Sequence, residues 1–166
     1  TVPEDWRTLG FDDSSWDTGP SGIGSRTEDA TRVSQTRSVF IRKIFTVNSA
    51  DNITHALLNV DYEDGFVAYI NGVEVARANM DGEPGTIPGA TELSSGSREM
   101  VMYESGEPEA FNIENIAEII QTGENVLAVE VHNDMFAYSN LSVIPFLTLG
   151  MKTPPACRAA GFSCSL

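Results

Sequence analysis

Short apolar or alternating runs, separated by turn residues, fill the chain from about residue 38 onward. The longest is Ser38–Val47, in which the odd-numbered positions are apolar except for Lys43 and the even-numbered positions include Phe40 and Ile44. A strand of this kind is covered on both faces. Similar runs lie at 56–60, 66–70, 73–76, 126–132 and 143–149. Many short strands in one chain predict an all-β fold.

The connections between these runs sharpen the prediction. Asn71-Gly72 is typical of a type I′ hairpin, because both central residues of that turn need positive φ. Asp61–Gly65 is expected to interrupt or turn the run at 56–60, and Pro145 places the last run at a sheet edge or a bulge. A long irregular stretch at 79–109 contains five glycines and three prolines. A loop of that length is usually functional or mobile.

One helix is predicted, over Asn112–Gln121. Its isoleucines follow helical spacing, Asn112 suits the cap, and Gly123 suits the position after the end. The order of elements therefore predicts a jelly-roll-type β-sandwich with one short side helix. The sandwich is expected over residues 1–150, and residues 151–166 are expected to be a tail or linker. Cys157 and Cys164 in that tail permit a small disulfide loop in an oxidising compartment, or two free thiols.

The charge balance narrows the partners. Ten basic and 24 acidic residues give a net charge of −14, so nucleic acid is a poor partner. No run of apolar residues is long enough for membrane insertion. The acidity fits a solvated surface, bound Ca²⁺ or a neutral ligand such as a sugar. With two histidines and no GxSxG, HExxH or phosphate-loop pattern, we expect no enzyme activity. Asn52 and Asn140 begin N-glycosylation sequons.

A series of motifs in fixed order resembles a known family. These motifs are Phe11–Trp16 (FDDSSW), Gly22–Gly24, Phe40–Val47, Val60–Arg77 (VDYEDGFVAYINGVEVAR) and Gly123–Asn133. The series is similar to the galactose-binding-like β-sandwich modules that occur beside glycoside hydrolases and in bacterial surface proteins with spore-coat-type or lamin-tail domains. The resemblance implies an extracellular or cell-surface module. Such modules have a further aromatic-bearing strand before the FDDSSW segment. We expect that strand to be absent here or supplied by a neighbour.

The acidic segment around Tyr62 offers one set of candidate site residues. Asp61, Glu63 and Asp64 are spaced closely enough to hold Ca²⁺, a hard cation that prefers oxygen ligands. Asp61, Tyr62 and Asp64 are also candidates for sugar contacts. The alternative is a polar bulge that keeps a sheet edge soluble.

A second set of candidates follows the strand at 126–132. His132 and Asn133 can exchange hydrogen bonds with sugar hydroxyls, and the resemblance places His132 at the rim of the sandwich. Tyr138, in a probable surface loop, is a candidate stacking platform, although anchoring of that loop is the commoner role. For Trp16 we favour a structural role over sugar stacking. For Arg26 we favour pairing with Glu28 and Asp29.

These features favour a non-catalytic extracellular carbohydrate-binding module that holds a glycan at one rim. Two alternatives stay open. One is that the chain is a structural or adhesive module of a surface protein, filament or matrix. The other is that it is an accessory domain of a glycoside hydrolase. In either alternative its partners are neighbouring domains of a larger protein or assembly.

Overall fold

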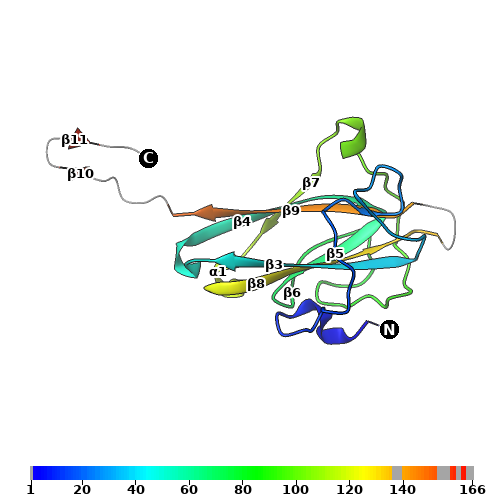
Figure 1. Cartoon of the computed structure of the whole chain (residues 1–166), viewed down its shortest axis with the longest axis horizontal. Coiled ribbons are helices and arrows are strands. Elements are labelled where there is room, and N and C mark those ends of the chain that lie inside the picture. The colour runs from blue at the N-terminus through cyan, green and yellow to red at the C-terminus, as the bar shows by residue number, and fades with distance from the viewer. Residues whose placement is uncertain (1, 136–139, 153–157, 160–161, 164–166) are drawn as a thin grey trace.

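Two β-sheets stack face to face in the computed structural model, which describes residues 2–135, 140–152, 158–159 and 162–163 (Figure 1). One sheet has the order β3-β8-β5-β6, with β3 Ser38–Val47, β8 Gly123–His132, β5 Gly65–Ile70 and β6 Val73–Ala78. The other has the order β2-β1-β9-β4-β7, with β2 Thr31–Arg32, β1 Ile23–Gly24, β9 Ser142–Met151, β4 Ile53–Glu63 and β7 Glu109–Ile113. The predicted all-β sandwich is confirmed.

The remaining elements are short. Strands β10 (Arg158–Ala159) and β11 (Phe162–Ser163) pair with each other in a separate two-stranded sheet. The helical turns are α1 Ile116–Ile119 and the 3-10 helices η1 Glu4–Arg7, η2 Ala50–Asn52 and η3 Met102–Glu104. Among the described residues, no helix has the length and apolar character needed to span a membrane.

The main core lies between the two sheets. Leu58 and Val60 of β4 face Val129 and Val131 of β8, and all four are buried. Strand alternation explains the pattern, because every second side chain of β4 and β8 points to the same face. Full burial of one such side chain stabilises the fold by about 1.5–3 kcal/mol. Burial of this layer therefore stabilises the packing of the two sheets.

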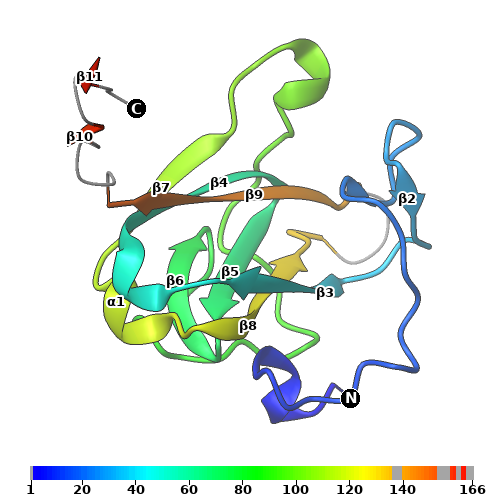
Figure 2. The ribbon, with the colours of Figure 1, turned by 60° about the vertical axis from the view of Figure 1, so that its left-hand side comes forward.

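A second apolar cluster covers the outer face of the four-stranded sheet. The N-terminal segment, dark blue in Figure 2, places Trp6 against Tyr69 and Phe40 with ring centroids 6.0 and 5.1 Å apart. Trp16 stacks on Trp6 at 6.4 Å. The Arg42 side chain, 2% exposed, binds the Asp13 carboxylate at 2.8 Å and the Trp6 carbonyl. The FDDSSW segment therefore packs as a cover of the sheet, which is the structural role favoured for Trp16.

The Asn71-Gly72 hairpin is confirmed. Asn71 and Gly72 have φ values of 51° and 86°, as a type I′ turn requires. Pro145 also lies where an edge was predicted. Strand β9 pairs with β4 along its length, but β1 reaches only Ser142 and Val143 on the other side. The missing N–H of Pro145 therefore breaks no ladder on that open side.

Two element predictions are wrong. The helix predicted over Asn112–Gln121 is only the four residues of α1, because Asn112 pairs with Leu57 in strand β7. The left-handed residue Asn115, with φ of 55°, separates that strand from the helix. The strand predicted at 56–60 is also longer than expected, Ile53–Glu63, so the turn within the predicted segment 61–65 lies at Asp64. Pairing with β9 keeps the polar residues 61–63 in the ladder.

Candidate functional site

The acidic segment lies at one end of the sandwich, where β4 passes into β5. Asp61, Glu63 and Asp64 are each 2% exposed or less. Asp61 and Glu63 point to the outer face of the five-stranded sheet, opposite to the core residue Tyr62 between them. The long loop between β6 and β7 covers this face, so the predicted site residues are enclosed by the chain itself.

Asp61 binds that loop directly. Its carboxylate accepts hydrogen bonds from the backbone N–H groups of Val101 at 3.0 Å and Met102 at 2.7 Å. The Arg98 guanidinium donates to the same carboxylate at 3.0 Å and lies 4.1 Å from the centre of the Tyr62 ring. The Tyr62 hydroxyl donates to Glu109 at 2.7 Å, and burial raises the pKa of Tyr62. Asp61 therefore holds the start of η3 in place.

Glu63 forms a second tether. Arg26 donates to Glu63 at 2.8 Å and also pairs with Glu99. The expectation that Arg26 pairs with Glu28 and Asp29 is wrong for its side chain, although its backbone N–H donates to the Asp29 carboxylate at 2.7 Å. Burial is the main cause that raises the pKa of Glu63, whereas Arg26 acts in the opposite direction. Arg26 therefore joins the segment between β1 and β2 both to β4, through Glu63, and to the long loop, through Glu99.

Asp64 fixes two further segments. It accepts hydrogen bonds from the backbone N–H groups of Arg98 at 3.0 Å and Asp134 at 2.9 Å. Burial raises the pKa of Asp64, against the effect of these two donors. The turn at Asp64 thus ties both the long loop and the end of β8 to the sheet.

His132 belongs to a buried chain of polar groups on the outer face of the four-stranded sheet. Its Nδ1 is 2.9 Å from the Glu92 carbonyl and its Nε2 is 3.3 Å from Glu130. The Tyr69 hydroxyl donates to the same carboxylate at 2.6 Å, and burial and Glu130 raise the pKa of Tyr69. His132 lies on the predicted outward side of β8 but is fully buried under the loop. It is therefore enclosed, not presented at the rim.

The other predicted positions complete this account. Asn133 is buried, donates its backbone N–H to Arg37 at 2.8 Å and accepts from Ser94 at 3.0 Å. The sequon residues Asn52 and Asn140 are both exposed. Tyr138, Cys157 and Cys164 lie outside the described residues, so the stacking platform and the disulfide remain predictions.

The structure brings the predicted residues together as a tether of the long loop, which we call the rim network: Asp61, Glu63, Asp64, Glu130, His132 and Asn133 with Arg26 and Arg98. In the part of the chain that the structure describes, every buried side-chain nitrogen and oxygen has a hydrogen-bond partner. The same part holds no group of three histidine, cysteine or acidic side chains placed to bind a metal ion. The three carboxylates predicted as Ca²⁺ ligands are directed at N–H groups and guanidinium groups.

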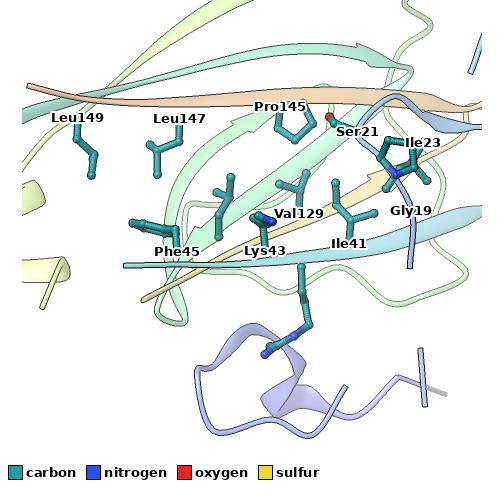
Figure 3. Close-up of a pocket in the computed structure, with 13 residues that line it drawn as sticks. Gly19, Ser21, Ile23, Ile41, Lys43, Phe45, Val129, Pro145, Leu147 and Leu149 are labelled. Atoms are coloured by element: carbon teal, nitrogen blue, oxygen red, sulfur yellow. The ribbon is translucent and has the colours of Figure 1, made fainter. Parts of the chain in front are cut away.

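A groove of about 470 Å³ lies between β3 and β9 (Figure 3). Leu147 and Leu149 point into it from β9, and Ile41 and Phe45 point into it from β3. Val129 of β8 forms the floor, while Gly19 and Ser21 lie at one end. Sequence reasoning missed this groove, because apolar residues on alternating strands are expected in the core.

Lys43 is the one charged side chain of β3 that points into the groove. It pairs with Leu127 across to β8, which places it on the inner face of the sheet, and it is exposed. In the described part of the chain its ammonium has no hydrogen-bond or ion-pair partner. Neighbouring Arg42 points to the other face, where it binds Asp13. The groove therefore offers apolar walls and one positive charge.

Comparison with known proteins gives only remote likenesses. No family model and no curated protein matches the sequence. The chain is similar to part of a β-glucuronidase of glycoside hydrolase family 2 (18% identity, 83% of this chain and 13% of that chain, TM-score 0.47). It is also similar to part of an α-L-rhamnosidase from Streptomyces avermitilis (18%, 69% and 9%, 0.43) and of one from Aspergillus terreus (17%, 74% and 13%, 0.42). These likenesses, all with TM-scores below 0.5, carry no argument about function.

Proposed function

We propose that this chain is a non-catalytic β-sandwich module of a larger extracellular protein, which packs against a neighbouring polypeptide through the groove between β3 and β9. The observation that carries the proposal is the contrast between that groove and the rim. The rim network is closed by its own loop, whereas the groove leaves Ile41, Phe45, Leu147 and Leu149 only partly covered.

The chemistry of the groove favours a polypeptide over a glycan. Sugar sites combine aromatic faces with several hydrogen-bonding groups. Here the side chains that line the walls are mainly aliphatic, Phe45 is the one aromatic ring among them, and Lys43 supplies the inward-pointing charge. Partly covered apolar area of this kind is stabilised by contact with other apolar side chains.

The sequence supports the wider setting. Its motif series resembles modules that accompany glycoside hydrolases and bacterial surface proteins, so the proposed neighbour is another domain of such a protein. Carbohydrate binding at the rim, an extracellular location and a bound Ca²⁺ ion remain predictions. The same holds for the division into a sandwich and a C-terminal tail.

Two measurements test the proposal. The first is a glycan array probed with the folded chain, with and without EDTA. No binding is expected, and a glycan signal that a Tyr62→Phe or Asn133→Ala variant abolishes while remaining folded would establish a carbohydrate-binding module instead.

The second measurement asks whether the groove accepts an apolar probe. We expect the native chain to bind the dye 8-anilinonaphthalene-1-sulfonate, and Leu147→Glu to weaken that binding by about tenfold, which corresponds to about 1.4 kcal/mol. Phe146→Glu is the matched control. Phe146 is the neighbouring residue on the opposite face of β9 and is 43% exposed. Equal dye binding by both variants would overturn the groove as the docking surface.

A further inference from the structure

Strand β3 lies at the edge of the four-stranded sheet. It is the first strand of the order β3-β8-β5-β6, and its ten residues pair with β8 in an unbroken register from Ser38 to Val47. The backbone N–H and C=O groups of alternate residues therefore point away from the sheet, in the arrangement that accepts another strand. Within the described residues, no segment is paired with this edge.

The facing edge of β9 is a poorer acceptor. Pro145 interrupts the row of N–H donors, and the end near Ser142 is already occupied by β1. A strand added to β3 instead extends the four-stranded sheet without a break. Its inward side chains then reach the groove and contact Leu147 and Leu149 of the other sheet. One added strand thus satisfies both the free backbone edge and the open apolar walls.

A second copy of this chain does not suit the edge. If two β3 strands paired in antiparallel fashion about the middle of the strand, Lys43 of one copy would lie opposite Lys43 of the other. Like charges directly opposite one another destabilise a strand pair. The occupant is therefore a segment of different sequence.

Lys43 sets the charge of that segment. An inward-pointing lysine also protects a free edge from indiscriminate pairing, so a strand that pairs there has to neutralise it. Opposite charges across a strand pair stabilise the pair by roughly 0.2–1 kcal/mol. We propose that β3 accepts an extended strand from a partner polypeptide, with apolar side chains at alternate positions and a carboxylate facing Lys43. This inference rests on the proposed function and adds the partner's chemistry.

The test uses synthetic nine-residue peptides with the intact chain. The parent peptide carries valine at positions 1, 3, 7 and 9, threonine at the even positions and glutamate at position 5. The comparison peptide is the same except that it carries lysine at position 5. We expect the glutamate peptide to bind about five- to tenfold more tightly than the lysine peptide at low salt, and to slow hydrogen exchange of alternate β3 amides.

A charge reversal makes the test specific. Lys43→Glu is expected to reverse the preference of the chain for the two peptides. Lys152→Glu, at the other lysine of the chain, is expected to leave the preference unchanged. No peptide binding, or a preference that survives Lys43→Glu, would overturn the inference. If the dye still reports an open groove in that case, the proposed function stands and only the strand partner is refuted. If dye and peptides both fail to bind, both proposals are refuted.

Discussion

The rim network and the β3–β9 groove differ in how far the chain covers them: the first is buried under the long loop and the second is partly exposed. At the rim, polar side chains such as Asp61 and His132 are buried and bound by backbone groups of the long loop. In the groove, leucines and isoleucines remain partly open, and Lys43 has no partner among the residues that the structure describes. Residue types that usually signal a site are structural here, and residue types that usually signal a core form the open surface.

The difference teaches how burial changes the meaning of a polar cluster. Charges are buried only where partners offset the loss of water, and removing one partner leaves the other without compensation. The rim network should therefore be sensitive to substitution, whereas the groove should tolerate substitution because its residues already contact water. The following predictions test that contrast.

The largest effect is expected at Asp61. Asp61→Ala removes the acceptor of the Val101 and Met102 N–H groups and the partner of Arg98. We expect the free energy of unfolding to fall by about 3–5 kcal/mol, since a broken buried ion pair leaves donors unsatisfied. Urea unfolding measures the change. Exposed Asp17→Ala is the control, and it should stay within about 0.5 kcal/mol of the native chain. Equal losses of unfolding free energy for both variants would contradict a structural role of the rim network.

A smaller loss is expected when the N-terminal cover is detached. Arg42→Ala removes the bonds to Asp13 and to the carbonyls of Trp6 and Thr8. Charged hydrogen bonds of this kind are worth about 1.5–3 kcal/mol each, and we expect a total loss of about 2–3 kcal/mol because Trp6 keeps its packing. Tryptophan fluorescence should shift to the red. Exposed Arg32→Ala should change neither quantity, and an unshifted Arg42→Ala spectrum would show that the cover does not depend on Arg42.

The pH dependence sharpens the role of Glu63. Burial raises its pKa above the usual 4.5, so the folded state binds more protons than the unfolded state between 4.5 and the raised value. Stability from this group is present below 4.5 and is lost as pH rises through the raised pKa. The amide of Glu63→Gln does not titrate, so this variant lacks that pH-dependent loss of stability. The native chain should therefore lose stability relative to Glu63→Gln as pH rises above 4.5.

Urea unfolding at a series of pH values between about 4 and 8 checks this sign. Glu99→Gln is the matched control, because Glu99 contacts the same Arg26 but its side chain is 75% exposed. A native chain that gains stability relative to Glu63→Gln as pH rises would contradict the raised pKa and the burial of Glu63.

The smallest effect is expected in the groove. Lys43→Ala removes an exposed ammonium without a partner in the described part of the chain. The free energy of unfolding should change by less than about 0.5 kcal/mol. Thermal unfolding measures this change, with Lys152→Ala as the control variant. A loss above about 1 kcal/mol for Lys43→Ala alone would mean that the groove is closed in solution and is not an open surface.

The sequence by itself determined the elements whose local pattern agrees with the fold. Ser38–Val47 is a strand because its alternating apolar sets suit a strand covered on both faces, and Asn71-Gly72 is a hairpin turn because few other residues adopt positive φ at both positions. The all-β sandwich follows from such short-range signals. The helix at 112–121 was mispredicted because pairing of Asn112 with Leu57 on β4 outweighed helical spacing.

Only the tertiary structure decided what the polar residues do. Asp61 and Val101 are distant in the sequence, and no local pattern shows that one caps the other. The same is true of Arg26 and Glu63. The groove likewise depends on which strand lies at a sheet edge, and strand order is set by long-range pairing. Burial and edge position are properties of the assembled sheets. They decide that these polar side chains bind the chain's own long loop and that β3 lies at a sheet edge.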